Sequence, residues 1–502
     1  MEATLTRRVG PCAIVVLAAL AVAAGGGDHR VADAAKARDV AALTFLLKQA
    51  ADVNAPQPDG TTALHWAARW DDLATVDRLL GAGATVDAAN RYGVTPLFVA
   101  ATNGNAAIIE RLLQAGADPD TVSGTDATAG EGEPALLAAA RTGSVDSVKA
   151  LLAHGAKADA TERWHQQTAL MWAAVADAPG AVQALLAAGA NVGAAAEGGF
   201  TALHYAARAG SLEATRLLVG AGADVKALLG DRSSPLMLAI INARYELAAF
   251  LLDHGANPND DSLGFTPLHQ LVWSYHPNVV FMPPGPRQTG SLSAMDFARL
   301  LLARQANPNA RMTRNPADGY RTSMNRNGAT PLMMAARVPD LDLMRLLLAS
   351  GADPKLKTAD NTTLLMVAAG YGWQAGESPE ALPGAHMEAV KLALELGNDV
   401  NAANDRGYTA LHAAVIRESN EVIQFLVDKG GDLTAKTKEE DPRFVGVGEG
   451  KTPLRVAEGQ MINASYKYYP EQAAYLRKIM GLPPVEDLRI VPAPPKTAGT
   501  AQ

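Results

Sequence analysis

Histidine is the residue type in this chain whose spacing first suggests chemistry, because an imidazole can act as a general base or bind a metal. Four of the ten histidines lie three residues after a threonine: His65, His204, His269 and His412. They are far apart in the chain, no His-x-x-x-His pair accompanies them, and the only cysteine is Cys12. A row of metal ligands or catalytic bases is therefore disfavoured, and packing at the start of a helix is the simpler interpretation.

Glycine-rich stretches are the second candidate for chemistry. GAGATV from Gly81 and GAGADV from Gly220 could bind phosphate, but each follows an expected helix, whereas a phosphate-binding loop follows a strand and opens a helix. No Walker loop, GxSxG elbow or HExxH helix is present either. We therefore expect no enzyme activity, no cofactor and no metal site. A triad assembled from distant loops, or a hydrolase-like activity in the insertions, stays an open alternative.

These residues belong to a unit that recurs along the chain. Counted from a Thr, Ser or Pro anchor, the residue 17 positions later is leucine and the residue 21 positions later is glycine in eight copies. The anchors are Thr62, Thr95, Pro134, Thr168, Thr201, Ser234, Thr330 and Thr409. The leucines are Leu79, Leu112, Leu151, Leu185, Leu218, Leu251, Leu347 and Leu426, and the glycines are Gly83, Gly116, Gly155, Gly189, Gly222, Gly255, Gly351 and Gly430.

Each recurring position has a physical role. The anchor hydroxyl can cap a first helix, whose apolar residues follow at spacings of three and four, as at Leu203, Ala206 and Ala207. A second helix carries the leucine and ends at the glycine, which can adopt a left-handed conformation. A short extended finger with a turn at its tip follows. Helices this short are unstable alone, so each unit must stack on its neighbours.

The TALHYAA…GAD arrangement that begins at Thr201 resembles the ankyrin repeat, and its copies cover about residues 29 to 480. The resemblance implies an all-α solenoid of about 12 helix–turn–helix units, including atypical caps, with β-hairpin-like fingers. It also implies hydrogen bonds between the threonine and histidine of the motif. Finally, it implies a scaffold that binds an unknown protein or peptide through its groove and fingers.

The two ends of the chain have a different composition. Arg7 and Arg8 precede an apolar run, followed by small residues, so we expect residues 1–24 to be a signal peptide that is cleaved near Ala23 or Ala24. The protein would then be exported, to the periplasm if bacterial and otherwise by secretion, with no membrane span in the mature chain. An uncleaved anchor is the alternative. We expect residues 481–502 to form a disordered Pro-rich tail.

The charge excludes two classes of partner. The formal net charge is -8, and removing Glu2, Arg7 and Arg8 with the signal peptide changes it to -9. This balance gives no basic footprint for nucleic acid and no polybasic membrane patch. We expect a monomer.

Four insertions interrupt the regular spacing, near residues 276–293, 310–327, 370–386 and 436–450. Insertions in a repeat array fall in loops, where they are tolerated or carry function. One hypothesis therefore makes the first three insertions the specific contact with a partner.

Aromatic residues that we expect at the surface support a second hypothesis. On a helical wheel, the residue four positions after the anchor faces away from the stack and into the groove. That position holds Trp66, Trp172 and Tyr205, and Trp70 follows Trp66 by one turn. The finger turns add Tyr92, Trp164, Phe265 and Tyr408. We expect this set to bind a protein or peptide. The alternatives are that the rings pack against adjacent fingers, or that the groove binds a carbohydrate or other small ligand.

Overall fold

The computed structural model describes residues 28–124, 132–275, 287–314, 324–372, 384–438, 450–462 and 465–484. Within these ranges, 24 α-helices form twelve consecutive pairs. We call the first helix of each pair inner, the second outer, and the loop from an outer helix to the next inner helix a finger. The predicted all-α solenoid of about 12 repeats is confirmed.

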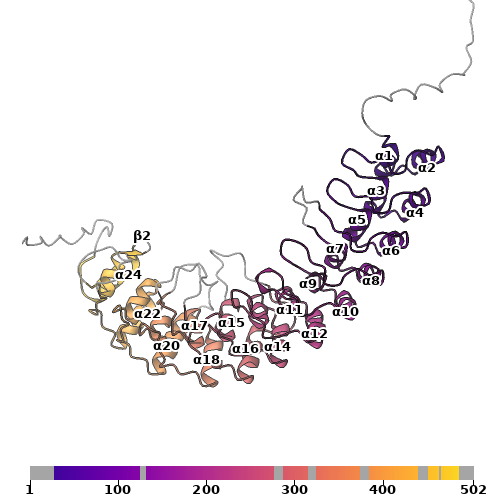
Figure 1. Ribbon diagram of the computed structural model, residues 1–502. Helices are drawn as coiled ribbons and strands as arrows, with labels where there is room; N and C mark the ends of the chain where they lie inside the picture. Colours follow the sequence, from indigo (N-terminus) through magenta and orange to yellow (C-terminus); the bar gives the residue numbers. More distant parts are fainter. Residues whose placement is uncertain are drawn as a thin grey trace, which may run out of the picture. The chain divides into compact units, whose positions relative to one another are not determined.

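The pairs fall into two compact units. Unit 1 comprises the residues up to 169 together with 187–189, and unit 2 comprises residues 170–186 and those from 190 onward. The helices of unit 1 are α1 (Arg30–Lys36), α2 (Val40–Lys48), α3 (Ala63–Arg69), α4 (Leu73–Gly81), α5 (Pro96–Asn103), α6 (Ala106–Gln114), α7 (Ala135–Arg141) and α8 (Val145–Ala153). Figure 1 shows the inner helices of this unit in one row and the outer helices in a second.

Unit 2 continues the same pairing. Its α-helices are α9 (Ala169–Val175), α10 (Pro179–Ala187), α11 (Ala202–Ala209), α12 (Leu212–Gly220), α13 (Pro235–Ile241), α14 (Tyr245–Asp253), α15 (Pro267–Tyr275), α16 (Ala294–Ala303), α17 (Pro331–Arg337), α18 (Leu341–Ala349), α19 (Leu364–Ala368), α20 (Ala385–Glu395), α21 (Ala410–Ile416), α22 (Asn420–Asp428), α23 (Pro453–Ala457) and α24 (Pro470–Ile479). A 3₁₀ turn, η1 (Glu197–Gly199), precedes α11. A short antiparallel pair, β1 (Gln460–Ile462) and β2 (Ser465–Lys467), separates α23 from α24.

Helix boundaries follow from local hydrogen bonds. The Thr95 hydroxyl accepts a hydrogen bond from the Phe98 N–H at 3.2 Å, and Ser234 and Thr330 cap α13 and α17 in the same way. Each of the eight recurring glycines has a positive φ between 85° and 94°, such as Gly222 at 94°. This left-handed conformation carries no Cβ penalty in glycine, so it ends the outer helix.

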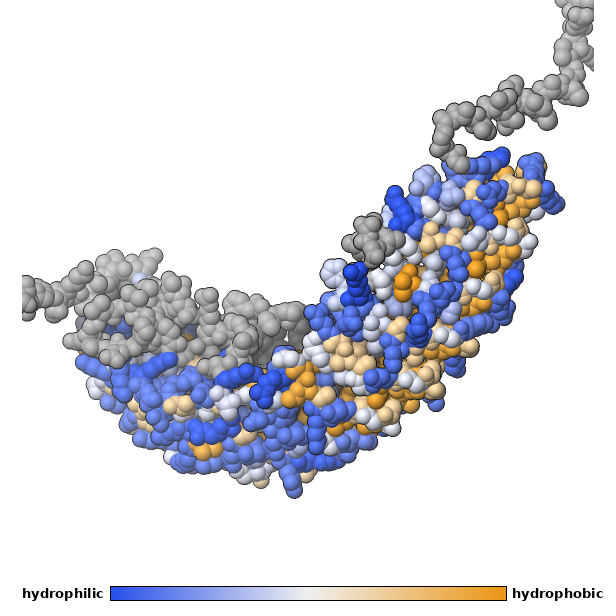
Figure 2. All heavy atoms as spheres, in the orientation of Figure 1, coloured by the Kyte–Doolittle hydropathy of each residue, from blue (hydrophilic) through white to orange (hydrophobic). Residues whose placement is uncertain are grey.

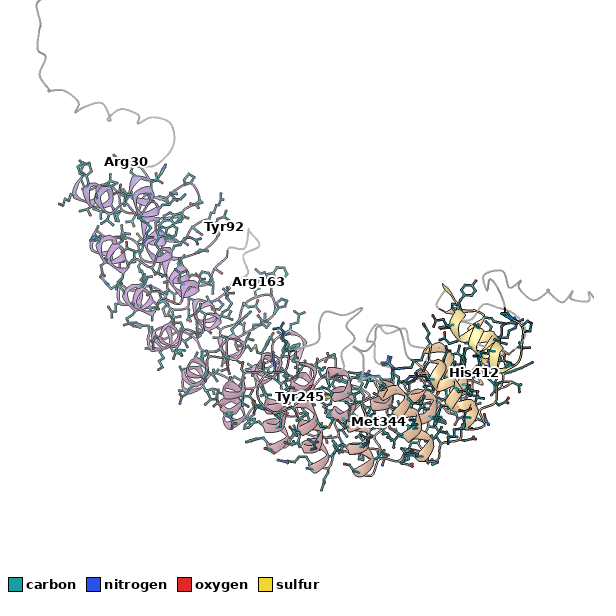
Figure 3. All side chains as sticks on the ribbon, turned by 180° about the vertical axis from the view of Figure 1, so that it is seen from behind. Arg30, Tyr92, Arg163, Tyr245, Met344 and His412 are labelled. Carbon is teal, nitrogen blue, oxygen red and sulfur yellow. The ribbon has the colours of Figure 1, made fainter. Side chains whose placement is uncertain are left out.

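The core runs along the stack of each unit. All eight recurring leucines, Leu218 among them, are fully buried between neighbouring repeats. Small alanines such as Ala206 and Ala207 let adjacent inner helices approach closely. In unit 2, the buried Tyr245 ring stacks on Phe297 with 5.3 Å between centroids (Figure 3 labels Tyr245). Burial between repeats therefore stabilises helices that could not persist alone.

The fingers are hairpin-like turns that hydrogen-bond to one another. Within one finger, the Gln57 N–H donates to the Thr61 carbonyl at 2.9 Å. Between fingers, the Arg91 N–H donates to the Asp59 carbonyl at 2.9 Å. These bonds satisfy backbone groups that a solvent-exposed loop would leave to water, and they fix the spacing of successive tips.

The expected insertions fall between helices. The segments 276–293 and 370–386 separate the inner from the outer helix of a repeat, whereas 310–327 and 436–450 lie in fingers. Their central parts (276–286, 315–323, 373–383 and 439–449) lie outside the described residues, as do residues 1–27 and 485–502 with the expected signal peptide and most of the expected tail. His386, at the edge of the third insertion, belongs to α20.

The described edge of the first insertion is bound to the repeat before it. Glu246 Oε1 accepts hydrogen bonds from the Ser291 N–H at 2.7 Å and from its hydroxyl at 2.8 Å, and Arg244 donates to the Thr289 hydroxyl at 2.9 Å.

Among the helices that the structure describes, none is both long enough and apolar enough to cross a membrane.

Candidate protein-binding surface

Two tryptophans form the most prominent aromatic feature of unit 1. Thr62 and His65 make a capping box that starts α3, and this start places Trp66 and Trp70 one turn apart on the same side. Their rings stack with 6.1 Å between centroids and 21° between planes. Trp66 is half-buried and Trp70 is 38% exposed, so the pair presents apolar surface to solvent.

A polar relay fixes the orientation of the first ring. Trp66 Nε1 donates a hydrogen bond to Gln57 Oε1 at 3.0 Å, and Gln57 Nε2 donates to Asp33 Oδ1 at 2.7 Å. Lys36 Nζ lies 5.0 Å from the centroid of the Trp66 ring. Because α1, the finger and α3 all contribute, the ring has a defined position before any partner binds.

Cations surround the second ring. The guanidinium groups of Arg38 and Arg69 each lie 6.0 Å from the Trp70 ring centroid. We call Lys36, Arg38, Trp66, Arg69 and Trp70 the aromatic patch. Its three cations are exposed and form no ion pair with any residue that the structure describes.

The nearby carboxylates are already engaged by the fold. Asp39 accepts from the Ala42 N–H at 2.8 Å as the cap of α2, and Asp72 accepts from the Thr75 N–H at 3.0 Å as the cap of α4. Asp71 Oδ1 accepts from the side-chain amides of Asn103 at 3.1 Å and Asn105 at 3.2 Å. Asp33 accepts from Gln57, and the pKa of Asp72 lies below its ordinary value despite burial because of its hydrogen bonds from Thr75 and the nearby charges of Arg78 and Arg38. The three cations of the patch therefore lie among four carboxylates that keep their negative charge.

Two fingers of unit 1 carry the remaining exposed rings of the expected set. Tyr92 is 44% exposed and Trp164 is 60% exposed. Asn90 Oδ1 accepts the Tyr92 N–H at 2.9 Å, and Arg91 lies 4.7 Å from the Tyr92 ring. Figure 3 shows Tyr92 and Arg163 on loops that project from the same side of this unit.

A buried carboxylate shapes the finger of Trp164. Glu162 is only 8% exposed, and its oxygens accept hydrogen bonds from the backbone N–H groups of Trp164 at 2.6 Å, His165 at 2.8 Å and Gln167 at 2.9 Å. These hydrogen bonds order the loop around the Glu162 carboxylate, while the indole of Trp164 stays exposed to solvent.

The expectation that the fourth position after the anchor faces solvent is wrong at Tyr205, which is only 9% exposed. Its ring packs against Phe200 in the preceding finger at 5.3 Å, and the Arg208 guanidinium covers it at 5.4 Å. Ala138 and Ala413 at the equivalent position are fully buried. Trp172, on α9 in unit 2, is half-buried.

Two aromatic residues of the fingers are also buried by neighbouring rings. Phe265 is 9% exposed and meets Trp273 edge to face at 5.0 Å. Tyr408 is 7% exposed and lies 5.4 Å from the ring of Tyr371. Both rings pack within the stack, so the alternative interpretation of structural packing describes them better than the exposed-anchor interpretation.

The recurring histidines hold the stack together. In each capping box, Nδ1 of His65, His204 or His412 accepts the N–H of the threonine at 3.1–3.2 Å. Their Nε2 atoms lie 2.9–3.1 Å from a carbonyl oxygen in the next finger. Burial lowers the pKa of His412 to about 4, which keeps the ring neutral. Within the described ranges, no three potential metal ligands gather.

Comparison with known proteins adds the family. A family model described as ankyrin repeats (3 copies) matches residues 31–123, 121–196, 203–282, 332–437 and 380–460. The chain belongs to the ankyrin repeat family. The threonine–histidine hydrogen bonds that the resemblance implied are present in its capping boxes.

Individual ankyrin relatives are distant. The chain is 24% identical to the E3 ubiquitin-protein ligase KEG of Arabidopsis thaliana over 321 residues, 58% of this chain and 18% of that protein. It is 34% identical to an ankyrin repeat-containing protein of Schizosaccharomyces pombe over 71 residues, 14% of this chain and 30% of that protein. The chain thus matches under a third of the length of either. The human ASB11 ankyrin repeat domain is 28% identical with a TM-score of 0.40, covering 45% of this chain and 98% of that domain.

The sequence analysis did not identify the polar residues in and beside the aromatic patch. Lys36 and Arg38 belong to the opening ankyrin repeat, which departs from the motif, and Gln57 lies in a finger. Aligning the opening repeat with the next repeat could have identified them, because α1 packs beside α3.

Proposed function

We propose that this ankyrin repeat protein is a non-catalytic scaffold that binds a protein or peptide through the aromatic patch of unit 1, and that it does so outside the cytoplasm. Ankyrin repeats mediate protein–protein interactions, and stacked repeats provide extended binding surfaces. Export rests on the signal-like composition of residues 1–24.

The observation that carries the proposal is the exposed, preorganised tryptophan pair. Stacking the repeats does not require a tryptophan at this position, because alanine fills it at Ala138 and Ala413. An exposed indole keeps its apolar face in water until a partner covers it, and such residues dominate protein interfaces. The hydrogen bond from Trp66 to Gln57 already fixes the orientation of the indole, so less side-chain entropy is lost when a partner binds.

Site-specific photocrosslinking tests the surface in the native compartment. A photoreactive phenylalanine in place of Trp70 should capture a defined protein, which is then identified and purified. The matched control replaces Phe45 on α2, which is 59% exposed but lies outside the aromatic patch. Figure 2 shows that apolar residues are also exposed over α2 and α4, so this control tests whether any exposed apolar surface suffices. Equal capture from both positions, or none from position 70, would contradict the proposal.

Two other functions would be revealed by this experiment and by shortening the insertions. If the crosslinked species is an oligosaccharide, the groove is a carbohydrate receptor. If capture persists after the expected insertions are shortened while a hydrolytic activity disappears, the insertions carry an enzyme function.

A further inference from the structure

We propose that His386 and Arg417 form an acid-sensitive contact between two repeats of unit 2, which holds these repeats together at neutral pH and lets them separate when the medium becomes acidic. His386 lies in the first turn of α20, and Arg417 directly follows α21 in the next repeat. The inference concerns unit 2 alone and does not depend on the proposed role of the aromatic patch.

The ring of His386 is enclosed at the end of the preceding inner helix. Hydrogen bonding to the backbone of Ala369 and Ala368, where α19 ends, engages one ring nitrogen. The other nitrogen, Nε2, is buried and makes no hydrogen bond to any residue that the structure describes. Because a carbonyl oxygen only accepts, the nitrogen that faces α19 carries the proton of the neutral ring. A second proton would have to enter at Nε2, where none of the described residues offers an acceptor.

Arg417 adds a positive charge at the same place. Its side chain packs so closely on Gly370 that a Cβ added to this glycine would lie 2.6 Å from the Arg417 Cβ. Gly370 has a φ of 118°, a conformation that glycine adopts without a steric penalty, so the approach is built into the backbone. A protonated His386 and Arg417 would therefore repel each other beside the end of α19.

The charged groups on the helices that pack against α20 do not compensate for this repulsion. α19 has no titratable side chain, and the other helices in contact with α20 are α18 and α22, which Figure 1 labels with it. The charged residues of α18, α20 and α22 are Asp342, Arg345, Glu388, Lys391, Glu395, Glu421 and Asp428. All except the half-buried Lys391 are exposed to solvent. In the part of the chain that the structure describes, Arg417 is the charged group that shifts the pKa of His386.

The pKa of His386 gives the direction of the pH dependence. Burial and then the charge of Arg417 lower it from 6.5 to about 3, and the hydrogen bonds to Ala369 and Ala368 offset only part of this shift. When the repeats separate, the ring returns to water, where it is protonated below pH 6.5. The contact is therefore stable at neutral pH and is lost as the pH falls from 6.5 toward 3. At pH 5 the equilibrium constant for opening should be about 30-fold larger than at pH 7.5.

Opening would expose a pair of buried tyrosines. The ring of Tyr371 lies 5.4 Å from that of Tyr408, which precedes α21, and both rings are buried. On the other side, Arg337 at the end of α17 donates to the Gly372 carbonyl at 3.1 Å. Residues 370–372 are thus held by the repeat before them and by the repeat after them. Acidification would release the second of these contacts and expose aromatic surface that is closed at neutral pH.

Hydrogen exchange measured by mass spectrometry on the full-length protein tests the inference. Between pH 7.5 and pH 5, exchange of residues 364–372 and of α20, corrected for intrinsic rates, should accelerate about 30-fold more in the wild type than in His386→Gln. His412 on α21 is common to both proteins, so its titration cancels. A loss of packing in His386→Gln would raise its exchange by the same factor at both pH values and would not change this comparison. His254→Gln removes an exposed histidine elsewhere in unit 2 and should accelerate as the wild type does.

Arg417→Gln tests the contribution of the charge. Without the guanidinium, His386 in the closed state should take up a proton more readily. Between pH 5 and pH 4 this variant should therefore accelerate less than the wild type, for which about tenfold is expected. Equal acceleration of the wild type and His386→Gln from pH 7.5 to pH 5 would overturn the inference. An Arg417→Gln variant that matches the wild type from pH 5 to pH 4 would overturn it as well.

Discussion

Replacing His269 by methionine should remove a pH-dependent link between two repeats of unit 2. Nδ1 of His269 accepts the Thr266 N–H at 3.2 Å, and Nε2 lies 3.2 Å from the carbonyl oxygen of Ala329, which precedes α17. Because Nδ1 accepts, Nε2 carries the proton and donates to Ala329. Methionine occupies the same position in the repeats of Met237 and Met333, so the substitution suits the packing.

The magnitude follows from two buried polar groups. Without the imidazole, the Thr266 N–H and the Ala329 carbonyl lose their partner, and each loss costs about 1–2 kcal/mol. We therefore expect the variant to be about 3 kcal/mol less stable locally at pH 7.5. Low pH should shrink this difference, because burial lowers the pKa of His269 from 6.5 to about 4.

The sign follows from proton uptake by the unfolded state. Below pH 6.5 the unfolded chain protonates this histidine while the folded chain does not, so the stabilisation is present at neutral pH and is lost as the pH falls toward 4. At pH 5 the loss is about 2 kcal/mol at 1.36 kcal/mol per pH unit. The gap between wild type and His269→Met should then be only about 1 kcal/mol.

Hydrogen exchange measured by mass spectrometry is the appropriate assay, since long repeat arrays do not unfold as one cooperative transition. Protection of α15 and α17 would be compared at pH 7.5 and pH 5, corrected for intrinsic exchange. The other histidines are common to both proteins, so their titration cancels in the difference. A gap that stays constant with pH would refute the account of a neutral, structural His269.

Two further substitutions, with Gly83→Ala as a control, test how the fingers are held. Glu162→Gln should accelerate exchange of the Trp164 amide about 30-fold, because charged hydrogen bonds contribute about 2 kcal/mol; unchanged exchange would show that the carboxylate does not order this finger. Gly407→Ala should destabilise unit 2 by about 2 kcal/mol or more, because φ is 78° and a Cβ would approach the Lys436 carbonyl to 2.7 Å. Gly83→Ala, with φ of 87° and no atom within 4 Å of its Cβ, should cost only about 1 kcal/mol; equal losses of hydrogen-exchange protection in the repeats that contain the two positions would contradict the contact between fingers.

The parts of the fold that were predictable are those set within a single repeat. The leucine at Leu218 and the glycine at Gly222 recur because each helix pair needs the same buried contact and the same left-handed end. Capping by Thr201 and His204 is equally local, since the residues involved are three positions apart.

The exposure of aromatic residues could not be predicted in this way. A helical wheel gives the direction of Tyr205 but not the Phe200 ring and Arg208 guanidinium that cover it. Burial of Tyr408 depends on Tyr371, which comes from another repeat. The cations of the aromatic patch were missed because Arg38 lies in a repeat that departs from the motif, where spacing alone gives no register.

Calorimetric titration of the purified crosslinked partner tests the central claim most directly. Trp66→Ala with Trp70→Ala removes both indoles of the aromatic patch, and Phe45→Ala removes a ring elsewhere on unit 1 that is 59% exposed, against 38% for Trp70. The account predicts that the double variant raises Kd at least about 30-fold, consistent with about 2 kcal/mol for interface anchors, while Phe45→Ala leaves Kd unchanged. Equal Kd values for wild type and double variant, with melting curves that coincide, would contradict it.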